Sequence, residues 1–314
     1  MHDKNATERL AANAQGISRA SALLDSGQCV AIPTETVYGL AARADQTEAV
    51  AAIYRAKGRP DFNPLIVHVA SLEQAMTLGA FDERACALAQ HFWPGPLTLV
   101  LPLKQGADIA PAITAGLPNI ALRCPAHTVM RKVLDKVGKP LAAPSANISG
   151  AVSPTSAGHV LETLDGRIAA VLDGGVSAAG LESTIIALRP DNRWQLLRHG
   201  PVTQEELTGY LGEPDAVTSH KVEAPGQLLQ HYSPGKPVRL NAQSPEADEY
   251  MIGFGPVTGD CTLSARGDLA EAAARLYDCL HKGGAAPQAR IAIAPVPDTG
   301  IGAAINDRLV RAAA

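Results

Sequence analysis

Two cations stand close together in the segment KGRPDFNPLIVHV, residues 57 to 69. Lys57 and Arg59 precede an apolar run that is typical of a buried strand, and Pro60 and Pro64 stiffen the backbone between the cations and this run. A solvated pair of charges needs no such stiffening, whereas a site that binds an anion benefits from it. The alternative is that the cations only follow a helix, because the macrodipole favours positive charge at a C-terminal end.

Polar side chains also follow a short apolar stretch in PSANISG, residues 144 to 150. Ser145 and Asn147 lie at the predicted end of a strand, which is where ligands bind in α/β sheets. The same side chains would be equally suitable for satisfying backbone groups of a loop. The sequence therefore offers a second candidate ligand segment beside a structural alternative.

Four further side chains are unusual for their positions. Arg123 ends an apolar strand, and a buried guanidinium there requires an anion such as a carboxylate or phosphate. His68 lies inside an apolar strand, where a hydrogen-bonded core histidine is the more common case. Thr34 and Thr36 follow another strand, and their hydroxyls can orient a small polar ligand. The candidate carboxylates are Glu35, Asp173 and Glu182.

Familiar nucleotide and hydrolase motifs are missing. Gly175 and Gly180 have the spacing of a P-loop, but no lysine follows them. Gly300 and Gly302 precede a predicted helix without the third glycine of a dinucleotide fingerprint. No serine–histidine–carboxylate order and no HExxH motif stand out. If a nucleotide binds, a less familiar pocket must hold it.

The composition is typical of a globular protein with a sizeable core: of 314 residues, 46% are hydrophobic and 18% are charged. The net charge of −4 argues against binding through nonspecific phosphate contacts, which requires a basic surplus. The five cysteines are odd in number and form no CxxC pair, which favours a reducing cytoplasm and no zinc site. We expect neither a signal peptide nor a membrane span, since no stretch approaches the roughly 18 apolar residues that a span requires.

Helical and strand-like segments alternate along residues 1–212, which predicts an α/β domain. The predicted helices include 18–26, 45–56, 82–92 and 128–137, and the predicted strands include 29–32, 65–69, 97–101, 120–123, 170–172 and 184–187. Residues 213–237 are rich in proline, glycine and polar side chains and are interpreted as a linker. Residues 238–314 alternate again and predict a second, smaller α/β domain.

Six motifs occur in the order found in the YrdC-like threonylcarbamoyl-AMP synthases: IPTETVYGLAARA, KGRPDFNPLIVHV, FWPGPLTLVL, IALRCPAH, PSANISG and LESTII. QHYSPGKPV and the trailing GIGAAINDRLVRAA resemble the linker and extra domain of the two-domain long form. The resemblance implies a YrdC-like twisted sheet with helices on its faces, then a linker and a smaller Rossmann-like α/β domain. We expect the linker to act as a lid, because Tyr232 lies in its middle.

The resemblance also implies an activity, that of an L-threonylcarbamoyladenylate synthase, which is a nucleotidyltransferase. Such an enzyme converts L-threonine, bicarbonate or CO₂, and ATP into threonylcarbamoyl-AMP and pyrophosphate, with Mg²⁺ held mainly by the phosphates. A tRNA threonylcarbamoyl transferase would then move the group to the adenosine beside the anticodon of tRNA. Whether the chain itself contacts tRNA stays open.

Site residues follow from the same resemblance. The family's K-x-R…S-x-N signature matches the residues expected to be catalytic, Lys57, Arg59, Ser145 and Asn147. Those expected to bind ATP are Arg59, Asn63, Asn119, Ser145, Ser153, Arg198 and Tyr232. Those expected to bind threonine are Thr34, Thr36, His68, Arg123, Ala143 and Ser183. Arg123 would pair with the threonine carboxylate, and Asn119, where the family usually has threonine, predicts a changed contact.

Two alternatives remain. A double-stranded RNA-binding or ribosome-maturation protein would use a basic concave surface, and the net charge of −4 weighs against it. A carbamoyl-transfer module would be accompanied by zinc-finger and acylphosphatase-like segments, which this sequence lacks.

Overall fold

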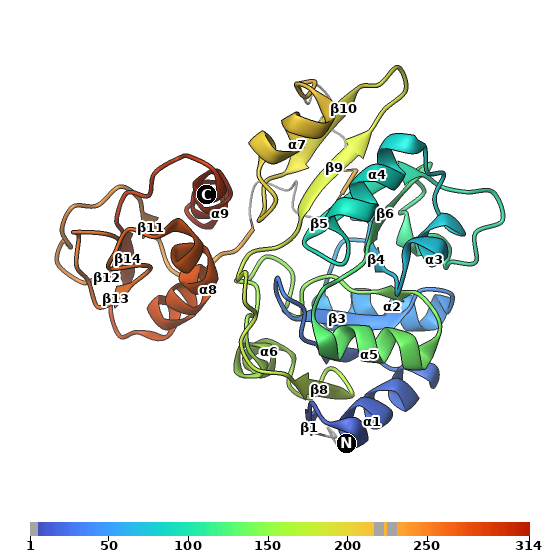
Figure 1. Cartoon of the computed structure of the whole chain (residues 1–314). Coiled ribbons are helices and arrows are strands. Elements are labelled where there is room, and N and C mark those ends of the chain that lie inside the picture. The colour runs from blue at the N-terminus through green and yellow to red at the C-terminus, as the bar shows by residue number, and fades with distance from the viewer. Residues whose placement is uncertain (1–5, 217–222, 225–230) are drawn as a thin grey trace.

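Two sheets of unequal size organise the chain (Figure 1). The structure, a computed structural model, describes residues 6–216, 223–224 and 231–314. The first domain carries a ten-stranded sheet, and the second carries a four-stranded sheet. The α/β class and the smaller second domain are confirmed. No helix within the described ranges is long and apolar enough to cross a bilayer.

The large sheet has the order β1-β8-β2-β3-β7-β4-β6-β5-β9-β10 and mixes parallel with antiparallel pairs. Its strands are β1 (Glu8–Ala11), β2 (Val30–Ile32), β3 (Gly39–Arg43), β4 (Ile66–His68), β5 (Leu97–Pro102), β6 (Asn119–Arg123), β7 (Leu141–Ala142), β8 (Ala170–Asp173), β9 (Thr184–Leu188) and β10 (Trp194–Arg198). β4 and β6 run parallel and place His68 directly beside Arg123. β5 and β9 also run parallel, with Leu97 paired to Thr184.

Helices cover both faces of this sheet (Figure 1). They are α1 (Ala14–Asp25), α2 (Thr47–Lys57), α3 (Leu72–Met76), α4 (Glu83–Phe92), α5 (Thr128–Val137), α6 (Ala157–Leu164) and α7 (Gln204–Leu211), with a 3₁₀ turn at Pro111–Ile113. Because successive strand residues point to opposite faces, Val30 and Ile32 join the core under α1 and α5. Ala31, between them, joins the core under α2 and α6.

Capping residues set several helix ends. Asn13 accepts a hydrogen bond from the Gly16 amide at 2.9 Å and begins α1, and Gly58 ends α2 in the left-handed region at φ 59°. Ser71 caps the short helix α3 by accepting from the Gln74 amide at 3.3 Å. The Gln74 side chain accepts from the Ala70 amide at 2.9 Å.

The second domain is a parallel sheet with two main helices. Its strands, in the order β11-β14-β12-β13, are β11 (Val238–Arg239), β12 (Glu249–Gly253), β13 (Cys261–Thr262) and β14 (Arg290–Ile293). Its helices are α8 (Leu269–Ala285) and α9 (Ile301–Ala312). Of the predicted linker, the structure describes residues 213–216, 223–224 and 231–237. Ser233, near its end, forms a parallel bridge with Ala151 of the first domain.

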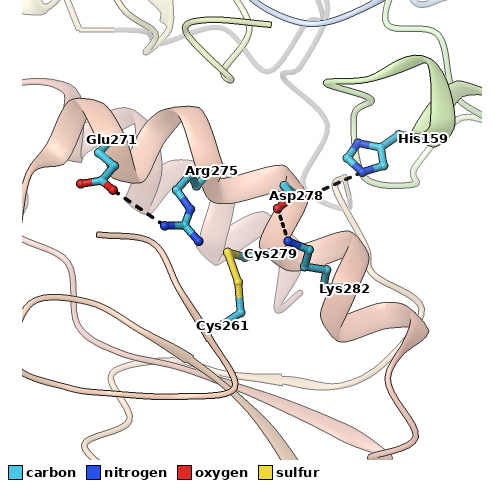
Figure 2. Close-up of a disulfide and its surroundings, with 7 residues drawn as sticks. All are labelled: His159, Cys261, Glu271, Arg275, Asp278, Cys279 and Lys282. Atoms are coloured by element: carbon cyan, nitrogen blue, oxygen red, sulfur yellow. Dashed lines mark hydrogen bonds and ion pairs between the residues drawn. A yellow bond between two sulfur atoms is a disulfide. The ribbon is translucent and has the colours of Figure 1, made fainter. Parts of the chain in front are cut away.

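A disulfide joins two elements of the second domain (Figure 2). It links Cys261 of β13 to Cys279 of α8, with the two Cα atoms 6.1 Å apart. This pairing is at odds with the reducing compartment that the cysteine pattern favours, because thiols stay reduced there. The sequence shows no pairing signal for these two residues, which are 18 positions apart.

The two domains touch closely along α8. Gly180 of the first domain has φ +69°, and a Cβ built there would lie 2.4 Å from the Cα of Ala274. Only a residue without a side chain fits so close to a helix backbone. On another part of α8, Asp278 faces His159 of α6 at 3.7 Å (Figure 2).

Candidate active site

One cavity of about 50 Å³ gathers most of the predicted ligand residues. It lies where β4 and β6 end and β9 begins, so the registers of these strands bring its walls together. Its lining consists of Thr34, Thr36, Val37, Gly39, Arg59, Ile66, His68, Arg123, Ala143, Pro144, Ser145, Glu182, Ser183, Arg198, His231 and Tyr232. Three arginines and several hydroxyls therefore face one small space, which suits anionic, hydrogen-bonding ligands.

Arg123 has the carboxylate partner that its burial requires, and that partner belongs to the chain. Its guanidinium donates to Glu35 at 2.5 Å, to the Thr36 hydroxyl at 2.9 Å and to the Gly95 carbonyl at 3.2 Å. Burial acts to raise the pKa of Glu35, but the charge and hydrogen bond of Arg123 outweigh it and the pKa is lowered. Two N–H groups remain beyond these three bonds, so the guanidinium can still bind a ligand carboxylate.

Hydroxyls and a neutral imidazole surround this arginine. The Thr34 and Thr36 hydroxyls lie 2.8 Å apart, and that of Ser183 lies 2.7 Å from the Thr98 hydroxyl. Burial, with the nearby Arg123 charge, lowers the pKa of His68 to about 3, so the imidazole is neutral at physiological pH. Its Nδ1 finds no hydrogen-bond partner among the described residues, which leaves it able to contact a ligand.

The proline-stiffened corner fixes Arg59. Its guanidinium donates to the carbonyl of Asn63 at 3.2 Å and to the carbonyl of Pro64 at 2.8 Å. Burial lowers the pKa of Arg59 to about 10, which still leaves it charged near neutral pH. The corner therefore presents a fixed cation to the cavity, in agreement with the interpretation of this segment as an anion site.

Lys57 lies behind the cavity wall instead of in it. Its ammonium donates to the carbonyl oxygens of Ser145 and Asn147, both at 2.6 Å, and burial lowers its pKa well below the usual value. The Asn147 amide likewise donates to the carbonyls of Ile148 and Ala151. The K-x-R and S-x-N segments are thus joined, with Lys57 and Asn147 shaping the loop that presents Ser145.

Three other predicted ATP residues do not line this cavity. Asn63 is buried and offers its carbonyl to Arg59, and Asn119 begins β6, at the opposite end of the strand from Arg123. Ser153 is fully buried and donates its hydroxyl to Glu182 at 2.5 Å. The structure does not test whether they reach a bound nucleotide, so their assignment stays a prediction.

Some lining residues were not assigned to the site from the sequence. Glu182 was only a candidate carboxylate, and His231 only part of the linker. Gly39 forms a bridge with Ser145, and a Cβ built on it would lie 3.1 Å from the Cβ of Ala143. All three residues lie within or beside a recognised motif, which is the signal that identifies them in retrospect.

Tyr232 closes one side of the cavity. It is fully buried, has φ +65° and stacks on Tyr277 of α8 with ring centroids 5.5 Å apart. Arg308 of α9 lies over its ring at 5.4 Å. The Tyr232 hydroxyl has no hydrogen-bond partner among the residues described. Burial raises its pKa to about 12, so the hydroxyl stays protonated and can donate. A polar group is therefore available at the closed end.

Known proteins resemble this chain along both of its domains. A family model described as telomere recombination matches residues 22–200, and one described as the threonylcarbamoyl-AMP synthase C-terminal domain matches residues 202–314. Threonylcarbamoyl-AMP synthase of Bacillus subtilis is 41% identical over 98% of this chain and 95% of its own length. That of Pyrococcus abyssi is 44% identical over 70% of this chain and 66% of its own.

A solved structure extends the likeness to three dimensions. P. abyssi Sua5 complexed with L-threonine superposes with a TM-score of 0.89, at 36% identity, over 98% of this chain and 97% of that one. The match includes both domains, so the arrangement of the second domain against the first is shared as well. The chain therefore belongs to the threonylcarbamoyl-AMP synthase family, in its two-domain form.

Proposed function

We propose that this chain is an L-threonylcarbamoyladenylate synthase, which makes threonylcarbamoyl-AMP and pyrophosphate from L-threonine, bicarbonate or CO₂, and ATP. Curated relatives with this name are 41% and 44% identical over most of the chain, and a solved relative holds L-threonine. The observation that carries the proposal is the cavity itself, in which Arg59, Arg123 and Arg198 converge with threonine and serine hydroxyls. A carboxylate and a chain of phosphates are the anions that this reaction must hold together.

The reaction has two bond-forming steps. The threonine amino group attacks the carbon of CO₂ and loses a proton, which gives an N-carboxylate. A carboxylate oxygen then attacks the α-phosphorus of ATP, and the bond to the bridging oxygen breaks as pyrophosphate leaves. Negative charge grows on the leaving oxygens, and fixed cations stabilise it without reorganisation. The mixed anhydride product is easily hydrolysed, so a closed cavity protects it.

The threonine subsite would lie around Arg123. Its remaining N–H groups would hold the carboxylate, and Thr34, Thr36 and Ser183 would surround the substrate hydroxyl. Neutral His68 would accept or donate one hydrogen bond, and Ala143 leaves space for the methyl group. The complex of P. abyssi Sua5 with L-threonine supports a threonine subsite in this fold.

The ATP subsite would lie around Arg59 and Arg198, on the side of the cavity that Tyr232 closes. Ser145 would contact a phosphate, with Lys57 and Asn147 fixing its loop. Arg198 already contacts Ser183, through its carbonyl at 3.0 Å and its hydroxyl at 3.1 Å, so the two subsites share a wall. Asn63, Asn119 and Ser153 would reach the nucleotide only if it extends beyond the lined cavity.

Mg²⁺ would be held by phosphate oxygens. Of the lining residues that the structure describes, only Glu182 is a carboxylate, and its oxygens already accept from Ser153, Tyr277 and Arg308. This donor set does not suit an ion bound mainly by protein, but it suits one that arrives with ATP. When bound, the ion would share the neutralisation of phosphate charge with the arginines.

We further propose a cytoplasmic place for the reaction, where the Cys261 and Cys279 thiols would be kept reduced, and a tRNA threonylcarbamoyl transferase as the consumer of the product. The unstable anhydride supports a partner that takes it directly. We also propose the division of the chain. Residues 1–212 would form the catalytic domain, residues 213–237 a linker that acts as a lid, and residues 238–314 an anchoring domain.

The test is conversion of substrates by the purified full chain. With ATP, Mg²⁺, L-threonine and bicarbonate, chromatography should detect threonylcarbamoyl-AMP, and labelled pyrophosphate should exchange into ATP only when threonine and bicarbonate are both present. Exchange that does not require threonine would contradict the proposed activity.

A further inference from the structure

Glu182 is a point at which the second domain contacts the wall of the cavity. Its Oε1 accepts from the Ser153 hydroxyl at 2.5 Å. Its Oε2 accepts from the Tyr277 hydroxyl of α8 at 2.7 Å and from Arg308 Nε of α9 at 3.0 Å. One carboxylate of the first domain is therefore held by two helices of the second.

This contact is buried. Arg308 and Tyr277 are fully buried, and Glu182 is 6% exposed. Arg308 also donates to the His199 carbonyl of the first domain at 2.8 Å and to Asp307 at 2.6 Å. Water does not screen such a pair as it screens a surface ion pair, and loss of one partner leaves the other charge uncompensated.

The second domain also reaches Ser153 by another path. His281 of α8 places its Nε2 3.2 Å from the Ser153 carbonyl, while the Ser153 hydroxyl donates to Glu182. The Ser153 carbonyl is thus fixed by α8, and the Ser153 hydroxyl is fixed by Glu182. The same helices support Tyr232, through the stacking of Tyr277 and the guanidinium of Arg308.

Charge around Glu182 explains why Arg308 matters. Burial acts to raise the pKa of Glu182, but the charges of Arg308 and Arg198 and the hydrogen bonds bring it to about 2. The titratable groups that face it are Arg308 of α9, Tyr277 of α8, Arg198 of β10, and His231 and Tyr232 of the linker. Without Arg308, the negative charge of an ionised Glu182 would offset the positive charge of Arg198. The cavity would then attract the phosphates of ATP less strongly.

We propose that Arg308 and Tyr277 are positioning residues for ATP, because they neutralise and orient Glu182 and through it set the charge and shape of the cavity wall. This inference rests on the proposed function, since it concerns the nucleotide of that reaction. Neither residue lines the cavity, so both act through the lining residues that they contact, Glu182 first and Tyr232 beside it. The second domain would then be part of the ATP site and not only an anchor for the linker.

The test compares full-length variants. Arg308→Gln should raise both the Kd for ATP, measured by calorimetry, and the KM for ATP by about 10- to 100-fold, as for loss of a charged hydrogen bond. The Kd for threonine should stay within about twofold, because Arg123 keeps its own partners. Arg308→Lys should recover part of the ATP affinity, since it restores charge without the planar fork.

The pH dependence of ATP affinity distinguishes a positioning role of Arg308 from a purely structural one. In the wild type, Glu182 is ionised throughout the physiological range, because its pKa is about 2. In Arg308→Gln, burial is no longer opposed by that charge, so the pKa of Glu182 rises. Protonation of Glu182 then removes the uncompensated charge, so the ATP affinity of Arg308→Gln should approach that of the wild type as the pH falls toward the raised pKa. Arg308→Lys should keep the wild-type pH dependence.

Arg275→Gln is the matched control, because Arg275 is a partly exposed cation of α8 that pairs only with Glu271 among described groups (Figure 2). It should leave ATP affinity and the pH dependence of that affinity unchanged. If Arg308→Gln is folded and matches this control in both measurements, the proposal is overturned.

If Arg308→Gln does not fold, Tyr277→Phe decides, because it removes only a hydroxyl. Unchanged ATP affinity in Tyr277→Phe overturns the proposal, and weakened ATP affinity supports it. Since calorimetry needs no turnover, failure of the proposed synthesis and failure of this inference are distinguishable.

Discussion

At the scale of single residues, Lys57 shows how a catalytic signature can act through the backbone. Its ammonium binds the carbonyl oxygens of Ser145 and Asn147 instead of projecting into the cavity. The sequence expectation that it meets phosphate charge directly stays a prediction. The geometry adds that removal of Lys57 would also release the loop that carries Ser145.

Lys57→Ala should lower turnover by about 10²-fold or more, the loss typical of one preorganised stabilising group. The measurement is formation of threonylcarbamoyl-AMP by a variant that circular dichroism shows to be folded. Lys132→Ala, an exposed lysine on α5, is the control and should turn over normally. Normal turnover in a folded Lys57→Ala protein would remove the residue from the mechanism.

Arg123→Lys should weaken threonine binding by about tenfold or more, because a single ammonium cannot serve Glu35, Thr36 and a ligand carboxylate together. Titration calorimetry with L-threonine measures this directly. Arg84→Lys, at a partly exposed ion pair with Asp82 on α4, should bind threonine as the wild type does. Equal affinities in the two variants would place the threonine carboxylate elsewhere.

Residues assigned to the site from the sequence lie together in the structure where a strand register brings distant positions together. His68 and Arg123 are 55 positions apart, yet the parallel pairing of β4 with β6 makes them neighbours. The role of Glu182 in the wall could not be foreseen, because its partners Tyr277 and Arg308 belong to another domain. Local sequence patterns identify strand ends, but they do not predict contacts between residues of different domains.

At the scale of elements, the strongly patterned segments are predicted well. The helix expected at 128–137 is α5 (Thr128–Val137), and the strand expected at 97–101 is β5 (Leu97–Pro102). Short elements such as β1, β3, β10 and α7 escape the sequence analysis, because two turns of helix or a few strand residues give little periodicity. They form because the sheet supplies partners, as Arg9 of β1 finds in Val171 of β8.

Another prediction at the scale of elements concerns the segment around Tyr232. Tyr232→Ala should leave threonine affinity nearly unchanged, but it should lower the ratio of intact threonylcarbamoyl-AMP to pyrophosphate in a single turnover, because water gains entry. Tyr232→Phe should fall between, since it keeps the ring and loses the hydroxyl. Tyr210→Ala, at an exposed tyrosine of α7, serves as the control. A ratio equal to that of the control would show that the linker is only a tether.

At the scale of the molecule, the second domain contacts two residues that line the cavity, Glu182 and Tyr232. A chain that ends after Gly212 loses Tyr232, Tyr277 and Arg308 together, so it should bind ATP more weakly than Tyr232→Ala does. Calorimetry of the two proteins with ATP checks this ranking, and threonine binding provides the measure that the first domain is still folded. Equal ATP affinity in both would assign the whole effect to the tyrosine.

The close approach at Gly180 bears on how such a protein can be inherited and recombined. Because its backbone lies against that of Ala274, with no room for a Cβ, the two surfaces are matched in shape at the level of the main chain. A chimera that joins the first half of one relative to the second half of another must preserve this fit. A substitution on either side of this contact therefore needs a compensating change on the other. The core of the second domain itself includes Val37, Val152 and Leu181 of the first.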